Sequence, residues 1–243
     1  MSTSTAAERM VLRAELSHKD RQIIGHTTEL TTRSVFVRTD AKLAIGDPVG
    51  VRLSFPRLLA PLELDAHVVA TDPGLGHGYP AGVTLEFDAA GLEHERLAQL
   101  LRQPAAASGV LGEIHRILVV EDSALMRDFM QLGADRFIGS AVQVTVQTTD
   151  SAEQALVHLG RQTYDLVLVD LFLPGLMDGA ALVRTLRETH ADLPVIGLSV
   201  GGEAARAAFL AAGADLFLDK PVVVKDVFST LERLTLMRAR STA

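Results

Sequence analysis

The hydrophobic period of this chain changes near its middle, and that change constrains the fold more than any other feature. Between residues 13 and 87, apolar residues alternate with polar ones, which is typical of strands with one buried face. Beyond residue 116, short apolar runs alternate with amphipathic stretches, which predicts strands and helices in turn. The sequence therefore predicts two domains, one all-β and one α/β.

The first half of the chain reads as a series of short strands. Residues 51–55, 62–68 and 83–87 place apolar side chains at every second position, and turn-forming Gly, Asp and Pro residues separate them. We therefore predict a small antiparallel barrel, followed by a short helix over residues 92–101. A Pro- and Ala-containing stretch after this helix is expected to be a linker.

The second half predicts a doubly wound, five-stranded parallel sheet. Each apolar run is followed by an amphipathic segment, and the run Leu166–Val169 is apolar throughout, as in a strand covered on both faces. We expect the flavodoxin-like order, with the first strand between the second and the third. The strands are expected at 117–120, 142–146, 166–169, 195–198 and 216–218, and the last helix from Val224 to Met237.

These patterns set the domain boundaries. Residues 1–103 form the barrel domain, 104–113 the linker and 114–243 the α/β domain. With 48% hydrophobic residues, the chain has enough apolar surface to bury a core in each.

Composition excludes several classes of function. Residues 1–108 carry 11 basic and 13 acidic side chains, and the remainder carries 12 and 17, so neither half has the basic excess of a nucleic-acid binder. The absence of cysteine excludes disulfides and thiolate metal sites. Neither an apolar signal core nor a run of about 18 apolar residues is present, so we expect a cytoplasmic protein without membrane insertion.

Charged and hydroxyl side chains stand at the ends of the predicted parallel strands. Glu121 and Asp122 follow the first strand, and Asp170 ends the third. Because the carboxyl ends of parallel strands meet at one edge, these carboxylates should lie close together, with either a proton or a cation among them. Mg²⁺ prefers such oxygen ligands, and with it bound Asp170 can attack phosphorus. Ser199 and Lys220, at the ends of the fourth and fifth strands, can bind the phosphoryl oxygens.

Residues 116–237 resemble a response-regulator receiver domain. The resemblance rests on Val-Val-Glu121-Asp122-Ser, Leu-Val-Asp170, Met177-Asp178-Gly179, Ser199 and Phe217-Leu-Asp-Lys220-Pro221, which occur in the family's order.

The resemblance implies a role for each matched position. Asp170 would be the phospho-acceptor, and Mg²⁺ would be bound by Asp122 and Asp170 directly, by Glu121 through water and by the backbone carbonyl of Phe172. Ser199 and Phe217 would form the switch, Lys220 would neutralise the acyl phosphate, and the Lys220–Pro221 bond is expected to be cis.

Two departures from the family pattern bear on activity. Gly175-Leu176 makes the loop after the acceptor strand one residue longer than usual. Val200 stands where the family keeps Ala or Gly, and its branched side chain is expected to crowd the phosphoryl pocket and slow turnover.

With Gly46-Asp47, Phe55-Pro56, Val68-Val69 and Glu86-Phe87 in this order, the first half resembles a PilZ domain, a small barrel that often binds cyclic di-GMP. Arg9 and Arg13 have the family's R-x-x-x-R spacing, and arginine suits the ligand because it grips phosphate and stacks on guanine. The family's second motif, [D/N]-x-S-x-x-G, is only partly kept: Glu29 replaces Asp or Asn, Thr31 replaces Ser and Ser34 replaces Gly. The glycine position is expected to need a positive φ or close approach of the ligand.

We therefore expect a two-component response regulator rather than an enzyme. A sensor histidine kinase or phosphotransfer protein would phosphorylate Asp170, and the PilZ-like domain would act on a downstream protein by contact, with or without cyclic di-GMP. Because the sequence ends with the α/β domain, we expect no C-terminal DNA-binding output. The alternative is a phosphorylation-independent scaffold in which both domains are degenerate. An FMN carrier of the same sheet order is disfavoured. Such a protein would need a hydroxyl-rich loop at a helix N-terminus to bind phosphate, whereas the first strand here ends in two carboxylates.

Overall fold

The computed structural model describes residues 7–74, 81–88, 91–102, 114–135, 143–200 and 202–241. The chain divides into two compact units. The barrel unit comprises Met1–Ala106 and Ser229–Ala243, and the sheet unit comprises Ala107–Phe228. The expected linker, residues 104–113, lies outside the described residues.

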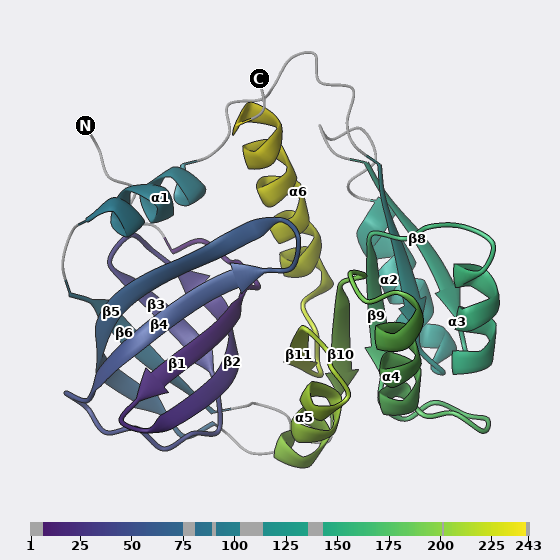
Figure 1. Ribbon diagram of the computed structural model, residues 1–243, viewed down its shortest axis with the longest axis horizontal. Coiled ribbons are helices and arrows are strands. Elements are labelled where there is room, and N and C mark those ends of the chain that lie inside the picture. The colour runs from purple at the N-terminus through teal and green to yellow at the C-terminus, as the bar shows by residue number, and fades with distance from the viewer. Residues whose placement is uncertain are drawn as a thin grey trace. The chain divides into compact units, whose positions relative to one another are not determined.

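Six antiparallel strands form a closed barrel, as the alternating pattern predicts (Figure 1). Their order is β1-β2-β3-β6-β5-β4, and pairing of β1 with β4 closes the barrel. Every second residue of β4 is buried, so the period-two pattern does mark the core face. The strands are β1 (Arg13–His18), β2 (Arg21–Leu30), β3 (Ser34–Arg38), β4 (Pro48–Phe55), β5 (Leu59–Asp72) and β6 (Gly82–Phe87).

Helix α1 (Leu92–Leu101) follows the barrel strands at the predicted residues. Its buried residues are Leu97, Leu100 and Leu101, which form a single stripe at helical spacing.

The sheet unit contains five parallel strands in the order β11-β10-β9-β7-β8. Strand β7 lies between β8 and β9, which confirms the flavodoxin-like order. The strands are β7 (Ile114–Val120), β8 (Gln143–Thr149), β9 (Leu166–Asp170), β10 (Val195–Ser199) and β11 (Leu216–Asp219). The helices are α2 (Ala124–Asp135), α3 (Ala152–Leu159), α4 (Gly179–Thr189), α5 (Gly202–Ala211) and α6 (Val224–Ser241).

The middle of the sheet is covered on both faces. All five residues of β9 and all five of β10 are buried. Helices α3, α4 and α5 contribute to one core cluster with β7, β9 and β10. Helix α2 packs closely on the start of α6: a Cβ at Gly133 would lie 3.0 Å from Val224 Cγ1 and 3.5 Å from Phe228 Cε2. The strand ends are therefore held by a rigid framework.

Helix α6 is longer than the sequence pattern indicates. It ends at Ser241 rather than near Met237, and from Ser229 onward it groups with the barrel. The expected boundary of 114–243 assigned the whole helix to the α/β domain. In the barrel unit, its residues Thr230, Leu231, Leu234 and Thr235 are buried. Among the described helices, none has the length and apolarity that a membrane span requires.

Candidate functional site

The ends of the parallel strands bring the predicted site residues together. Asp170 is the last residue of β9 and Ser199 the last of β10, while Lys220 directly follows β11. Backbone hydrogen bonds tie these ends to one another: Leu171 N donates to Leu198 O at 3.1 Å, and Lys220 N donates to Ser199 O at 2.9 Å. Glu121 N donates to Thr149 O at 3.0 Å, which fixes the end of β7 in the same way.

Lys220 bridges two buried carboxylates. Its Nζ lies 2.6 Å from Glu121 Oε2 and 2.7 Å from Asp170 Oδ2. Glu121 is 1% exposed and Asp170 5% exposed, so both carboxylates are almost fully removed from water. The peptide bond from Lys220 to Pro221 is cis, as expected.

Burial and pairing act in opposite directions on these charges. Burial raises the pKa of Glu121, and the hydrogen bond from Lys220 only partly offsets it. Burial also disfavours the Lys220 ammonium, but its hydrogen bonds to Asp170 and Glu121 prevail and raise the pKa of Lys220. Lys220 is thus held in its charged form, as a single cation among three acidic side chains.

The same residues fit a divalent cation. Glu121, Asp122 and Asp170 each offer a carboxylate oxygen, and these atoms all lie within 4.8 Å of one another. Asp170 Oδ1 is buried and makes no hydrogen bond in the structure. A buried carboxylate oxygen without a partner is costly, and three carboxylates with one ammonium leave two negative charges when all four groups are ionised. A Mg²⁺ ion would satisfy that oxygen and balance that charge.

Two further side chains hold the loop after β7. Arg127 Nη1 donates to the backbone carbonyls of Glu121 at 2.7 Å and Asp122 at 2.8 Å. Ser123 Oγ accepts from Met126 N at 3.4 Å, at the start of α2, as a capping serine does. Arg127 was not predicted as a site residue from the sequence. The sequence feature that could have identified it is an arginine one turn into a helix that begins just after a pair of carboxylates.

The longer loop after β9 is held by α3. Gly175 has a φ of +110°, and Glu153 Oε1 of α3 accepts from Leu176 N at 3.0 Å. Hydrogen bonds from backbone amides, its own and that of Leu176, lower the pKa of Glu153. The extra residue is thus accommodated by a turn with a specific partner. The loop ends where Asp178 caps α4, its Oδ1 accepting from Ala181 N at 2.7 Å.

Phe217 lies inside the sheet unit. It is 3% exposed, and its ring centroid lies 6.0 Å from that of Phe209. The Arg206 guanidinium of α5 lies 5.6 Å from the Phe217 ring centroid and binds Asp219 at 2.9 Å. The resemblance to receiver domains implies a switch role for Phe217, but nothing in the sequence indicates this arginine and carboxylate.

Two apolar side chains near the site face solvent. Val200 is 74% exposed and Phe172 60% exposed. Val200 follows the fully buried Ser199, so the chain passes from core to surface in one residue.

The residues predicted for cyclic di-GMP lie on and beside the first three barrel strands. Arg9 is exposed, whereas Arg13 Nε is held by Glu15 Oε1 at 2.8 Å. Glu29 is exposed on β2. Thr31 Oγ1 accepts from Ser34 N at 2.8 Å and forms a tight turn between β2 and β3.

Of the two alternatives for Ser34, the positive φ is wrong, whereas close approach of a ligand stays a prediction. Ser34 begins β3, and among described non-glycine residues only Lys19 and Arg57 have a positive φ. A side chain at this position therefore causes no backbone strain, because the residue is extended.

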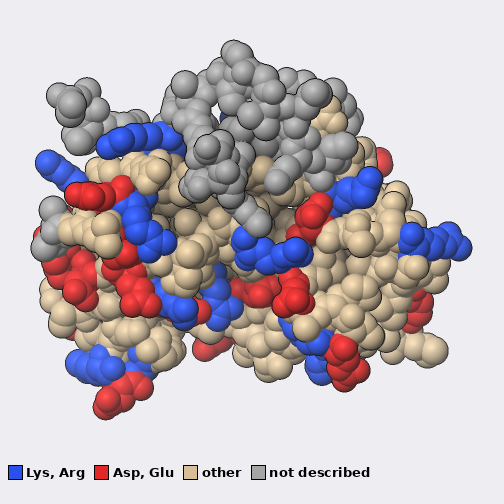
Figure 2. All heavy atoms as spheres, turned by 45° about the horizontal axis from the view of Figure 1, so that its top comes forward, with Lys and Arg blue, Asp and Glu red and all other residues tan. Residues whose placement is uncertain are grey.

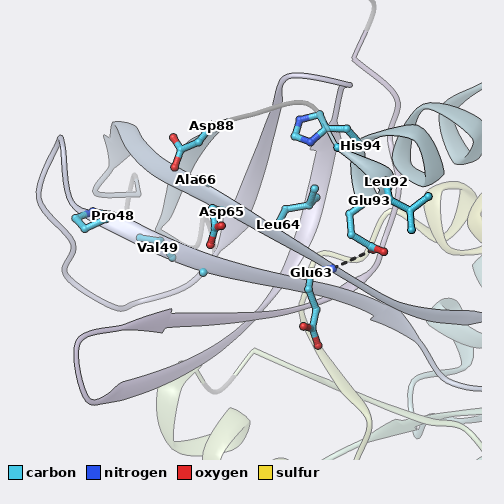
Figure 3. A pocket seen from close by; sticks show the side chains of 12 residues that line it. Pro48, Val49, Glu63, Leu64, Asp65, Ala66, Asp88, Leu92, Glu93 and His94 are labelled. Atoms are coloured by element: carbon cyan, nitrogen blue, oxygen red, sulfur yellow. Dashed lines mark hydrogen bonds between the residues drawn. The ribbon is translucent and has the colours of Figure 1, made fainter.

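The barrel also carries a pocket of about 670 Å³ beside α1 (Figure 3). Figure 3 shows Asp65, Asp88 and Glu93 around it, with Leu92 and His94 at the helix. None of the residues predicted for cyclic di-GMP lines this pocket. The carboxylates of Asp65, Asp88 and Glu93 would repel a phosphate ligand in this pocket.

The face drawn in Figure 2 shows acidic and basic side chains interspersed over the described surface. No broad basic patch is visible among the residues coloured there, in agreement with the charge balance of the sequence.

Comparison with known proteins agrees with the geometry of the sheet unit. The family model of the response regulator receiver domain matches residues 117–232. The virulence transcriptional regulatory protein PhoP of Salmonella choleraesuis is 34% identical over 120 residues, which are 49% of this chain and 51% of PhoP. The transcriptional activator protein PfeR of Pseudomonas aeruginosa is 32% identical over 136 residues, or 52% of this chain and 43% of PfeR.

The chain spans about half the length of the curated relatives it matches. Among solved structures, a putative response regulator from Chloroflexus aurantiacus is 26% identical, with a TM-score of 0.44 over 51% of this chain and 98% of that one. The matched residues, 117–232, include all of the strand-end side chains described above. The C-terminal half of this chain is a response regulator receiver domain.

Proposed function

We propose that this protein is a two-component response regulator that accepts a phosphoryl group on Asp170. The observation that carries the proposal is the buried Asp170 Oδ1 without a hydrogen bond, in a carboxylate whose other oxygen binds Lys220. A receiver domain implies a phosphodonor, here a sensor histidine kinase or a phosphotransfer protein.

Mg²⁺ would be held by Asp122 and Asp170, by Glu121 through water and by the carbonyl of Phe172. When bound, it neutralises charge on the carboxylates and the phosphoryl oxygens. The Asp170 carboxylate then attacks phosphorus: an O–P bond forms, and the P–N bond to the donor histidine breaks. Lys220 offsets the charge of the acyl phosphate, and the Ser199 hydroxyl donates to a phosphoryl oxygen. Val200 follows Ser199 and is 74% exposed, and we propose that it slows entry of the phosphodonor or attack of water on the acyl phosphate.

The Asp170→Asn variant provides the direct test. Incubated with acetyl phosphate and Mg²⁺, the wild type should gain one phosphoryl group by intact mass, and Asp170→Asn should gain none. Asp192→Asn, an exposed aspartate outside the site, is the matched control and should behave as the wild type. An unmodified wild type, or equal modification of Asp170→Asn, would overturn the proposal.

We further propose that the barrel is a PilZ-like output module that acts on a downstream protein by contact. Its closed six-stranded form and the arginine-bearing segment before β1 support this assignment. For cyclic di-GMP, Arg9 and Arg13 would bind phosphate, and Glu29, Thr31 and Ser34 would form the second binding motif. Glu15 competes for Arg13 at 2.8 Å, so we expect the wild-type barrel to bind cyclic di-GMP weakly.

Restoring the second motif tests the ligand. The triple variant Glu29→Asp, Thr31→Ser, Ser34→Gly should bind cyclic di-GMP at least about tenfold more tightly than the wild type in calorimetry. Adding Arg9→Ala should remove that binding, whereas adding Arg21→Ala, an exposed arginine of the β1–β2 hairpin, should not. Failure of the restored variant to bind would exclude the dinucleotide. If Asp170 also failed to accept phosphate, the phosphorylation-independent scaffold would be favoured.

A further inference from the structure

Helix α6 is one continuous helix that belongs to both compact units. Residues Val224–Phe228 lie in the sheet unit, and residues from Ser229 onward lie in the barrel unit. Its far half is integrated into the barrel unit, since Leu231 and Leu234 are buried there. The helix runs without interruption from Val224 to Ser241, so residues of both units share one hydrogen-bonded backbone.

Within the barrel unit, Thr230 binds the segment that carries the arginine pair. Val11 N donates to Thr230 Oγ1 at 2.9 Å, and Thr230 is 1% exposed. Residues 10–12 precede β1 and are held from the other side by Thr27, whose hydroxyl donates to Met10 O at 2.6 Å and accepts from Leu12 N at 2.9 Å. Two threonine hydroxyls, one from β2 and one from α6, therefore hold this stretch between Arg9 and Arg13.

Arg233, about one turn further along α6, contacts both Glu8, beside Arg9, and the C-terminal end of α1. Its Nη2 lies 2.9 Å from Glu8 Oε2, next to Arg9. Its Nη1 donates to Leu101 O at 3.2 Å and Leu100 O at 3.4 Å. The carbonyls of Leu100 and Leu101 are among the last of α1, where no backbone N–H of the helix is available to donate to them. One guanidinium thus joins the arginine segment to the end of α1.

The other end of α6 lies close in sequence to the phosphorylation site. The helix begins four residues after Lys220, whose ammonium binds Asp170. A phosphoryl group on Asp170 must change the partners of Lys220. The first turns of α6 pack against α2, where a Cβ at Gly133 would lie 3.0 Å from Val224 Cγ1.

We propose that Thr230 and Arg233 are positioning residues through which the state of Asp170 controls the arginine segment of the barrel. This inference rests on the proposed phosphorylation of Asp170. The receiver domain would then act on residues 8–13 of its own chain. Release or tightening of that segment alters how Arg9 and Arg13 are presented to an anionic ligand or protein.

Hydrogen exchange of the full chain tests the inference. Peptides covering residues 7–13 should change their exchange rate when the wild type is treated with acetyl phosphate and Mg²⁺, and should not change in Asp170→Asn. Thr230→Val removes the acceptor for Val11 N, so exchange there should rise about fivefold or more, as expected for one lost hydrogen bond. The change on phosphorylation should disappear in the same variant. Thr230→Ser keeps the hydroxyl and should restore both behaviours.

Failure of the inference and failure of the proposed function are distinguishable because phosphate content is measured by intact mass in the same samples. A wild type that gains phosphate but shows unchanged exchange at 7–13 would refute the coupling alone. A wild type without phosphate would refute both. Thr230→Val with unchanged exchange at Val11 would refute the positioning role in either case. Should Thr230→Val not fold, Arg233→Met with Arg233→Lys as its conservative partner gives the same comparison.

Discussion

Replacing Gly179 by Ala should lower the free energy of unfolding of the sheet unit by about 3 kcal/mol, the upper part of the range for overpacking. A Cβ at this position would lie 2.0 Å from Asp170 O, 2.8 Å from Asp170 C and 2.9 Å from Leu171 Cα. All three are backbone atoms, so no side chain can rotate away. Gly179 N also donates to Leu171 O at 3.0 Å, which holds the start of α4 against the end of β9.

Because the clash involves the backbone of Asp170, the same substitution should impair phosphorylation even where the protein remains folded. Urea denaturation followed by circular dichroism measures the first effect, and intact mass after acetyl phosphate treatment measures the second. Gly160→Ala is the matched control: its Cβ would meet nothing closer than Leu156 O at 3.5 Å, and its φ is −73°. It should be neutral or slightly stabilising. Equal stability of the Gly179→Ala and wild-type proteins would mean that the loop does not approach Asp170 so closely.

The sheet and its strand-end residues could be predicted because each depends on local signals. The continuous apolar run from Leu166 to Val169 identifies a strand buried on both faces, and Asp170 follows it directly. Once the sheet order is known, the positions of Glu121 and Lys220 relative to Asp170 follow from the parallel topology. The resemblance to receiver domains depends on the same positions, so sequence and structure agree there.

The positioning of these residues by distant side chains could not be predicted. Arg206 reaches Asp219, 13 positions away, and Glu153 reaches Leu176 N, 23 positions away. Thr230 accepts from Val11 N across 219 positions. A polar residue on a predicted helix is normally read as solvent-exposed, because nothing in its own neighbourhood reveals a remote partner. The division of α6 between the units was missed for this reason.

Replacing Arg206 by Met should lower the free energy of unfolding by about 3 kcal/mol, the scale for removing one partner of a buried ion pair. The Arg206–Asp219 contact is 2.9 Å, and the two side chains are 9% and 10% exposed. The guanidinium also lies over the Phe217 ring at 5.6 Å, a contact that adds roughly 0.5–2 kcal/mol when shielded from water. Arg184→Met on the exposed face of α4 is the matched control and should change stability by less than about 0.5 kcal/mol.

A double-mutant cycle separates the ion pair from packing. Arg206→Met, Asp219→Asn and the double variant should show a coupling energy of at least about 1 kcal/mol by urea denaturation. A coupling energy near zero would mean that Arg206 and Asp219 stabilise the fold by packing and not by attraction of their charges. The remaining loss in Arg206→Met, after the coupling is subtracted, reports the other contacts of the guanidinium, including that with Phe217. Because Asp219 adjoins Lys220, a variant that loses this pair should also accept phosphate from acetyl phosphate at a different rate. A pair that only stabilised the fold would leave that rate unchanged once the folded fraction is taken into account.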